Sequence, residues 1–142
     1  IRPSRGLGDV YKRQPFRLTA LVATRMRNGE GGSVINVSST GAIRPRGDII
    51  SYAAAKAGLN AMTEGMAHAF GPEVRVNFIM CGPFLTDISK AWDMEKFAER
   101  AKNYALRRGG EPDEVVGAAL YFASRASSFC TGAILKLDGG TP

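Results

Sequence analysis

The chain has 142 residues, of which 44% are apolar and 23% are charged, with 17 glycines and two cysteines. This length is enough for one ordinary domain, and the composition excludes collagen-like, disulfide-scaffold and disordered classes. The longest apolar runs are far shorter than the ~20 residues that a membrane span needs, and the sequence shows no signal-peptide pattern. We therefore expect a cytoplasmic protein with no membrane partner.

The formal net charge of +6 raises the question of nucleic-acid binding. Residues 1–14 hold four basic residues and one acidic residue, so half of the excess lies there. In the other 128 residues, 15 basic residues are interspersed with 12 acidic ones, which is typical of solvated helix faces rather than of a basic stripe. No nucleic-acid partner is predicted. No metal site is predicted either, because His68 is the only histidine and Cys81 and Cys130 lack CxxC spacing.

The first predicted helix starts at Pro15. Residues 1–14 show neither a helical nor a strand period, and we expect them to be a non-native leader or read-through segment ahead of a partial domain over 15–142. Asn28-Gly29 predicts the end of the helix. Its apolar residues recur on one face: Phe16, Leu18, Leu21, Val22 and Met26.

Two buried strands and a long helix are predicted next. The β-branched run 33–38 predicts a strand, and the alanine-rich segment 50–70 predicts a helix that packs closely against a neighbour and ends at Gly71-Pro72. A second apolar run over 74–80 predicts another strand. Alternation of apolar strands with helices implies parallel pairing, and so an α/β sheet covered on both faces.

The remaining segments complete this pattern. Residues 88–106 are weakly periodic and predict one or two helices. Pro112 is suited to the first position of a helix that continues over 115–124, and 133–137 predicts a last strand. In such sheets the reactive groups gather at the carboxyl ends of the strands, where the polar motifs of this chain lie.

Tyr52 and Lys56 are four residues apart near the start of the alanine-rich helix, which places them one turn apart on one face. A lysine ammonium close to a phenol favours the phenolate, so the pair suits proton transfer. Ser39, at the end of a predicted strand, is placed to hydrogen-bond the same reacting oxygen. On spacing alone, a half-buried tyrosine beside a solvated lysine is the more common explanation of such a pair.

Several motifs in order resemble the short-chain dehydrogenase/reductase family over the stretch from Pro15 to Gly140. Gly31–Ser39 is similar to the strand that ends in the family's catalytic serine, and Tyr52–Lys56 reads as its YxxxK motif. Further matches are the strand Val74–Asn77, the loop Gly82–Thr86, and the C-terminal segments Arg108–Val115, Thr131-Gly132 and Asp138–Gly140.

The resemblance implies hydride transfer between NAD or NADP and a small-molecule carbonyl or alcohol substrate, in a parent enzyme that is a homo-oligomer. Tyr52 would be the proton donor or acceptor, Lys56 would assist it and contact the nicotinamide ribose, and Ser39 would hold the substrate oxygen. Ser38 is less suited by its spacing to the tyrosine. Contacts on the nicotinamide side are expected from Tyr52, Lys56, Gly82, Pro83, Phe84 and Thr86.

Departures from the family pattern are equally informative. Cys81 stands where the family has proline before the loop glycine, and we interpret it as a packing residue. Tyr11 stands where the family has a helix asparagine, and Gly6-Leu7-Gly8 does not resemble the family's phosphate loop. We therefore expect the C-terminal part of a Rossmann-like doubly wound sheet without the N-terminal dinucleotide-binding strands.

Two functional hypotheses follow. The first is a fragment of an NAD(P)-dependent oxidoreductase that by itself has little activity. The alternative is a non-catalytic module that acts through oligomer contacts of the alanine-rich helix and the last strand. Trp92, Met94 and Phe97 lie where the family places its substrate-covering helices, and they either line an apolar pocket or form the core under that lid.

Overall fold

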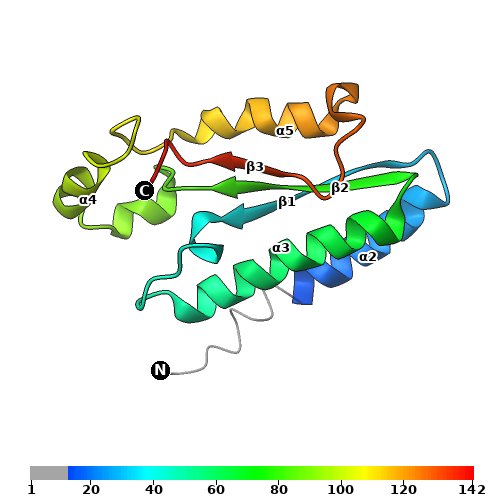
Figure 1. The fold of residues 1–142 in the computed structure, drawn as a ribbon, viewed down its shortest axis with the longest axis horizontal. Coiled ribbons are helices and arrows are strands. Elements are labelled where there is room, and N and C mark those ends of the chain that lie inside the picture. Colours follow the sequence, from blue (N-terminus) through cyan, green and yellow to red (C-terminus); the bar gives the residue numbers. More distant parts are fainter. Residues whose placement is uncertain (1–12) are drawn as a thin grey trace.

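The computed structural model describes residues 13–142, so Tyr11 and nearly all of the predicted leader lie outside the described residues. Three parallel strands form its sheet: β1 (Gly32–Ser39), β2 (Val74–Cys81) and β3 (Ile134–Leu137), in that order. In Figure 1 their arrows point the same way, which brings their carboxyl ends to one edge of the molecule. The predicted parallel α/β sheet is confirmed.

Helices cover both faces of this sheet (Figure 1). On one face, α2 (Gln14–Arg27) and α3 (Ile50–Phe70) enclose a core with β1 and β2, formed by Ala23, Met66, Ala67, Val74 and Val76. On the other face, α5 (Val116–Ala123) buries Ala118 and Phe122 against Ile79. The two cores follow from the strand period of two, which sends alternate side chains of β2 to opposite faces.

Alanines allow α3 to lie close to the sheet, because Ala53, Ala55 and Ala67 are all buried. The helix ends at Phe70, as the sequence predicted, and Gly71 follows with an extended backbone. In α2, by contrast, the sheet contacts the face of Thr19 and Ala23. The predicted apolar face of this helix is largely exposed: Phe16, Leu18, Leu21 and Val22 have exposed fractions of 52%, 64%, 66% and 36%.

The segment after β2 contains two short helices, η3 (Asp87–Ala91) and α4 (Met94–Ala101), which agrees with the prediction of one or two helices. Asp93 caps α4 by accepting a hydrogen bond from the Lys96 amide at 3.1 Å. We call residues 87–104 the α4 segment, and in Figure 1 it lies near the carboxyl ends of the strands. It therefore lies at the edge of the sheet where parallel α/β proteins place their ligands.

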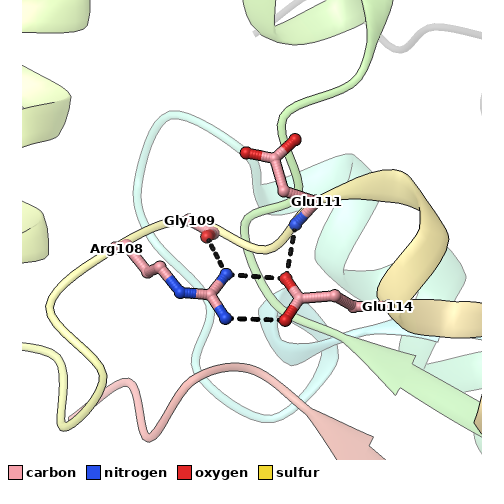
Figure 2. A network of polar contacts seen from close by, with 4 residues as sticks. All are labelled: Arg108, Gly109, Glu111 and Glu114. Carbon is pink, nitrogen blue, oxygen red and sulfur yellow. Dashed lines mark hydrogen bonds and ion pairs between the residues drawn. The ribbon is translucent and has the colours of Figure 1, made fainter.

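The predicted helix after Pro112 begins as a 3₁₀ turn, η4 (Pro112–Val115), before α5 starts. Figure 2 shows the ion pair at this start: the two terminal guanidinium nitrogens of Arg108 each lie 2.6 Å from a carboxylate oxygen of Glu114. Glu114 also accepts from the Glu111 amide at 2.7 Å. The loop from the α4 segment is thus tied to the start of α5. Within 13–142, no helix is both long and apolar enough to span a membrane.

Candidate active site

Ser39 and Tyr52 face the same small space at the carboxyl end of β1. Ser39 is the last residue of β1, and its Oγ accepts a hydrogen bond from the Gly41 amide at 3.1 Å. Tyr52 lies in the first turn of α3 and is half-buried. A Cβ atom built on Gly41 would lie 3.4 Å from Ser39 Oγ and 3.6 Å from Tyr52 Cε1. The two predicted site residues are therefore brought together.

Lys56 is buried, with an exposed fraction of 8%, so it is not the solvated lysine of the simpler alternative. Its Nζ donates to the carbonyl oxygen of Val37 at 2.7 Å and lies 5.9 Å from the ring centroid of Tyr52. Burial lowers the pKa of the Lys56 ammonium, and the nearby Cys81 opposes that shift. Of these contacts, the Val37 carbonyl was not foreseeable from the sequence, because a backbone acceptor leaves no residue-type signal.

The loop after β2 joins the site through the register of the sheet. Ser39 pairs with Cys81, so Gly82 follows directly beside the end of β1. Gly82 is needed there for a close approach, because a Cβ on it would lie 2.6 Å from the Cα of Asp138. Its amide donates to the Leu137 carbonyl at 2.8 Å, which ties the loop to β3.

The other predicted cofactor contacts lie further along this loop. Pro83 accepts from the Gly110 amide at 3.0 Å, and the ring of Phe84 packs where a side chain on Gly110 would be. Thr86 is exposed. Pro83 and Phe84 line a cavity of about 180 Å³ together with Leu106, Arg108 and Leu137. None of Ser39, Tyr52 and Lys56 lines this cavity, and the register of β1 with β2 is what brings the loop beside these three residues.

Cys81 has both a packing and an electrostatic environment. Its side chain packs against the core under α5, as the sequence interpretation proposed. Burial raises the pKa of its thiol, and the Lys56 ammonium opposes this effect. Sequence distance hid that neighbour, because Lys56 and Cys81 lie on different elements. His68 is exposed on α3, in agreement with its interpretation as a surface residue.

The α4 segment resolves part of the question about its aromatic residues. Phe97 is buried and packs with Trp92 at a centroid distance of 5.3 Å and with Tyr104 at 6.4 Å. Met94 is 49% exposed. Phe97 therefore belongs to a core within the segment, and Met94 is open to solvent.

A family model described as enoyl-(acyl carrier protein) reductase matches residues 9–142. The chain belongs to the short-chain dehydrogenase/reductase family. It is 35% identical over 135 residues to a 3-oxoacyl-[acyl-carrier-protein] reductase of Chlamydia trachomatis, covering 94% of this chain and 52% of that protein. The resemblance that the sequence motifs predicted is confirmed.

Solved structures of this short-chain dehydrogenase/reductase family have the same fold. A 3-oxoacyl-[acyl-carrier protein] reductase from Brucella melitensis superimposes with a TM-score of 0.91 and 29% identity, over 99% of this chain and 54% of that one. A 7α-hydroxysteroid dehydrogenase complexed with NADH and a 7-oxo bile acid superimposes with a TM-score of 0.82 and 33% identity. The match covers 89% of this chain and 50% of that one. The chain spans about half the length of the curated relatives it matches.

Proposed function

We propose that this chain provides the acid–base part of an NAD(P)-dependent oxidoreductase that interconverts a small carbonyl compound and its alcohol. The observation that supports it most directly is the meeting of Ser39, Tyr52 and buried Lys56 at the carboxyl end of β1. Two similar solved proteins were crystallised with NADH, one with succinate and one with a 7-oxo bile acid. The choice between NAD and NADP stays open.

The donor set suits a nicotinamide nucleotide. Lys56 and Tyr52 offer an ammonium and a hydroxyl for ribose hydroxyls, and the backbone from Gly82 to Thr86 is proposed to lie against the nicotinamide ring. The cofactor supplies or accepts the hydride when it is bound. All other steps fall to side chains of this chain.

In the reduction, negative charge grows on the carbonyl oxygen as its carbon receives hydride. Tyr52 donates its hydroxyl proton to that oxygen, which completes the alcohol and leaves a phenolate. The Ser39 oxygen accepts from the Gly41 amide, and its hydroxyl hydrogen is proposed to be donated to the substrate oxygen. Lys56, fixed by the Val37 carbonyl, stabilises the phenolate until a proton from solvent restores it.

The test is Tyr52→Phe in the full-length enzyme of which this chain is proposed to be the acid–base part, with Tyr121→Phe at an exposed position of α5 as the matched control. Oxidation of reduced nicotinamide by a panel of ketones should fall by roughly 10²–10⁴-fold in Tyr52→Phe, because the transferable proton is lost. Cofactor binding, measured by fluorescence, should stay nearly unchanged, and Tyr121→Phe should behave as wild type. Unchanged turnover in Tyr52→Phe refutes the proposal, and equal loss of binding and turnover indicates a folding role for Tyr52.

The same assay tests the prediction that these 142 residues by themselves turn over little. An ordinary rate with the isolated chain would refute it. The cytoplasmic location and the homo-oligomeric state expected from the sequence likewise stay predictions, as does the leader over 1–14.

A second candidate function is a non-catalytic module that acts through oligomer contacts. It is favoured by apolar side chains near the last strand that are exposed in the described part of the chain: Leu120 at 63%, Ile134 at 50% and Phe129 at 104%. Sedimentation of wild type and Phe129→Ser distinguishes the two functions. If the variant dissociates while no assay condition gives Tyr52-dependent turnover, the module is the better description.

A further inference from the structure

Two side-chain hydrogen bonds join β1 to α3 next to the candidate acid–base pair. The Ser38 hydroxyl donates to Oδ1 of Asn60 in a short hydrogen bond, and Nδ2 of Asn36 donates to Oγ1 of Thr63 at 2.9 Å. Thr63 in turn donates to the Leu59 carbonyl at 2.8 Å, within its own helix. We call Asn36, Ser38, Asn60 and Thr63 the polar ladder.

The polar ladder approaches the candidate site along α3. The strand and helix run in opposite directions (Figure 1), so moving two residues along β1 from Asn36 to Ser38 corresponds to moving back three residues along α3, from Thr63 to Asn60. Lys56 is the next α3 residue on this face toward the site, and its Nζ donates to the carbonyl of Val37, the β1 residue before Ser38, at 2.7 Å. Asn60 is one helical turn after Lys56 on the same face.

These hydrogen bonds are buried and differ from the apolar contacts around them. Ser38 and Thr63 are 2% and 0% exposed, and a buried hydroxyl is costly unless it is paired. The neighbouring contacts between α3 and the sheet are apolar, through Met66, Ala67 and Val76. Apolar contacts between small side chains have no direction, whereas a hydrogen bond fixes both the slide and the rotation of a helix on a strand.

We propose that Asn60, acting through Ser38, is a positioning residue that holds α3 on β1 at the register where Lys56 and Tyr52 meet Ser39. This inference rests on the proposed function, since the register matters for chemistry only if these three residues perform it. The Ser38–Asn60 hydrogen bond is the step of the polar ladder nearest the site. The Asn36–Thr63 bond lies one step further away and serves mainly to join the two elements.

The test compares three variants of the full chain: Asn60→Leu, the double variant Ser38→Ala with Asn60→Leu, and the control double variant Asn36→Leu with Thr63→Val. The urea midpoint of unfolding and the pKa of Lys56, followed by NMR of the lysine side chains, are measured for each. The single variant leaves a buried hydroxyl unpaired and should lower the midpoint, whereas the double variant removes both partners and should recover much of the loss.

If Asn60 positions α3, the Ser38/Asn60 double variant should still have an altered Lys56 pKa. The pKa should move toward the ordinary lysine value, because the ammonium becomes less buried. The control double variant should keep the wild-type Lys56 pKa. Under conditions that give turnover, kcat of the Ser38/Asn60 double variant should fall by roughly tenfold or more with little change in KM, because misplacement of a catalytic group by about an ångström has effects of this size.

Two results overturn the inference. One is a Ser38/Asn60 double variant whose Lys56 pKa is that of wild type, which makes the hydrogen bond purely structural. The other is an equal pKa change in the control double variant, which makes the effect a general loosening of α3. Both are distinguishable from failure of the proposed function, which is judged by the turnover of Tyr52→Phe and not by the pKa of Lys56.

Discussion

The Arg75 side chain donates hydrogen bonds to carbonyls at the carboxyl ends of α5 and of η5 (Arg125–Ser127). Its guanidinium donates to the carbonyls of Phe122 at 3.0 Å, Ser124 at 3.2 Å and Ser127 at 2.9 Å. These are carbonyls at helix ends, which lack partners within the helix. One cation thus adds hydrogen bonds at several helix-end carbonyls at once.

Replacing Arg75 by methionine should lower the free energy of unfolding by about 1.5–3 kcal/mol, because hydrogen bonds from a charged group are lost, although the Phe122 carbonyl keeps the hydroxyls of Ser33 and Ser127 as donors. Urea unfolding of the chain measures this. Arg125→Met, at an exposed position, is the control and should change the free energy by less than about 0.5 kcal/mol. Similar values for the two variants would show that the carbonyls find water instead.

Gly82 permits the contact between the loop after β2 and Asp138. Gly82→Ala places a methyl group 2.6 Å from the Cα atom of Asp138, the residue after β3, so the backbone has to shift. We expect a loss of about 1–3 kcal/mol in unfolding free energy, the usual cost of overpacking. Thermal unfolding with a matched Gly47→Ala control, where nothing lies within 4 Å, measures the difference. Equal melting temperatures would contradict the close approach.

At the scale of elements, replacing either of two helix glycines by alanine should stabilise the fold. Gly65 in α3 and Gly117 in α5 are exposed, and a Cβ on either would meet no atom within 4 Å. Alanine restricts the unfolded backbone and favours the helix, so Gly65→Ala and Gly117→Ala should each raise the free energy of unfolding by about 0.5–1 kcal/mol. Chemical denaturation checks this, and a destabilised variant would indicate a helix distortion at that glycine.

Elements with a strong period were predictable, and contacts between elements were not. The predicted strands over 33–38 and 74–80 correspond to β1 and β2. The predicted helix end at Gly71-Pro72 matches the end of α3 at Phe70. The apolar period of α2 correctly predicted a helix but not the face that contacts the sheet, because the small residues Thr19 and Ala23 allow the closest packing there. Helix start signals at Pro112 could not distinguish a 3₁₀ turn from an α-helical one.

The same limit applies to the candidate site. Spacing suggested Tyr52 and Lys56 and the strand end suggested Ser39, and the resemblance to the family's ordered motifs then selected them, since all of these signals are local in sequence. The Val37 carbonyl and the Ser38–Asn60 bond depend on the register between β1 and α3, which no local pattern encodes. The close approach of Gly82 to Asp138 depends in the same way on the pairing of β2 with β3.

At the scale of the whole molecule, acid should release the tie between the α4 segment and α5. Arg108 and the Glu111 amide lower the pKa of Glu114 from 4.5 to about 2 (Figure 2). Because the folded pKa lies below the unfolded one, the stabilisation is fully present above about pH 4.5 and is lost as the pH falls toward 2.

The expected result is that Glu114→Gln unfolds at lower urea than wild type at pH 6 and that the two midpoints converge between pH 4.5 and pH 2. Glu64→Gln on α3 is the control for loss of one carboxylate on an exposed surface. A midpoint difference that is constant down to pH 2 would assign the effect of Glu114→Gln to packing rather than to the ion pair.

The order of the strands in the sheet has a consequence for synthesis. Because β1, β2 and β3 neighbour one another in the order of the chain, each strand adds beside one that the ribosome has already released. The β1–α3–β2 unit is complete at Cys81, and it already contains Ser39, Tyr52 and Lys56. A nascent chain can therefore assemble its acid–base side chains before the α4 segment that covers that edge has left the ribosome.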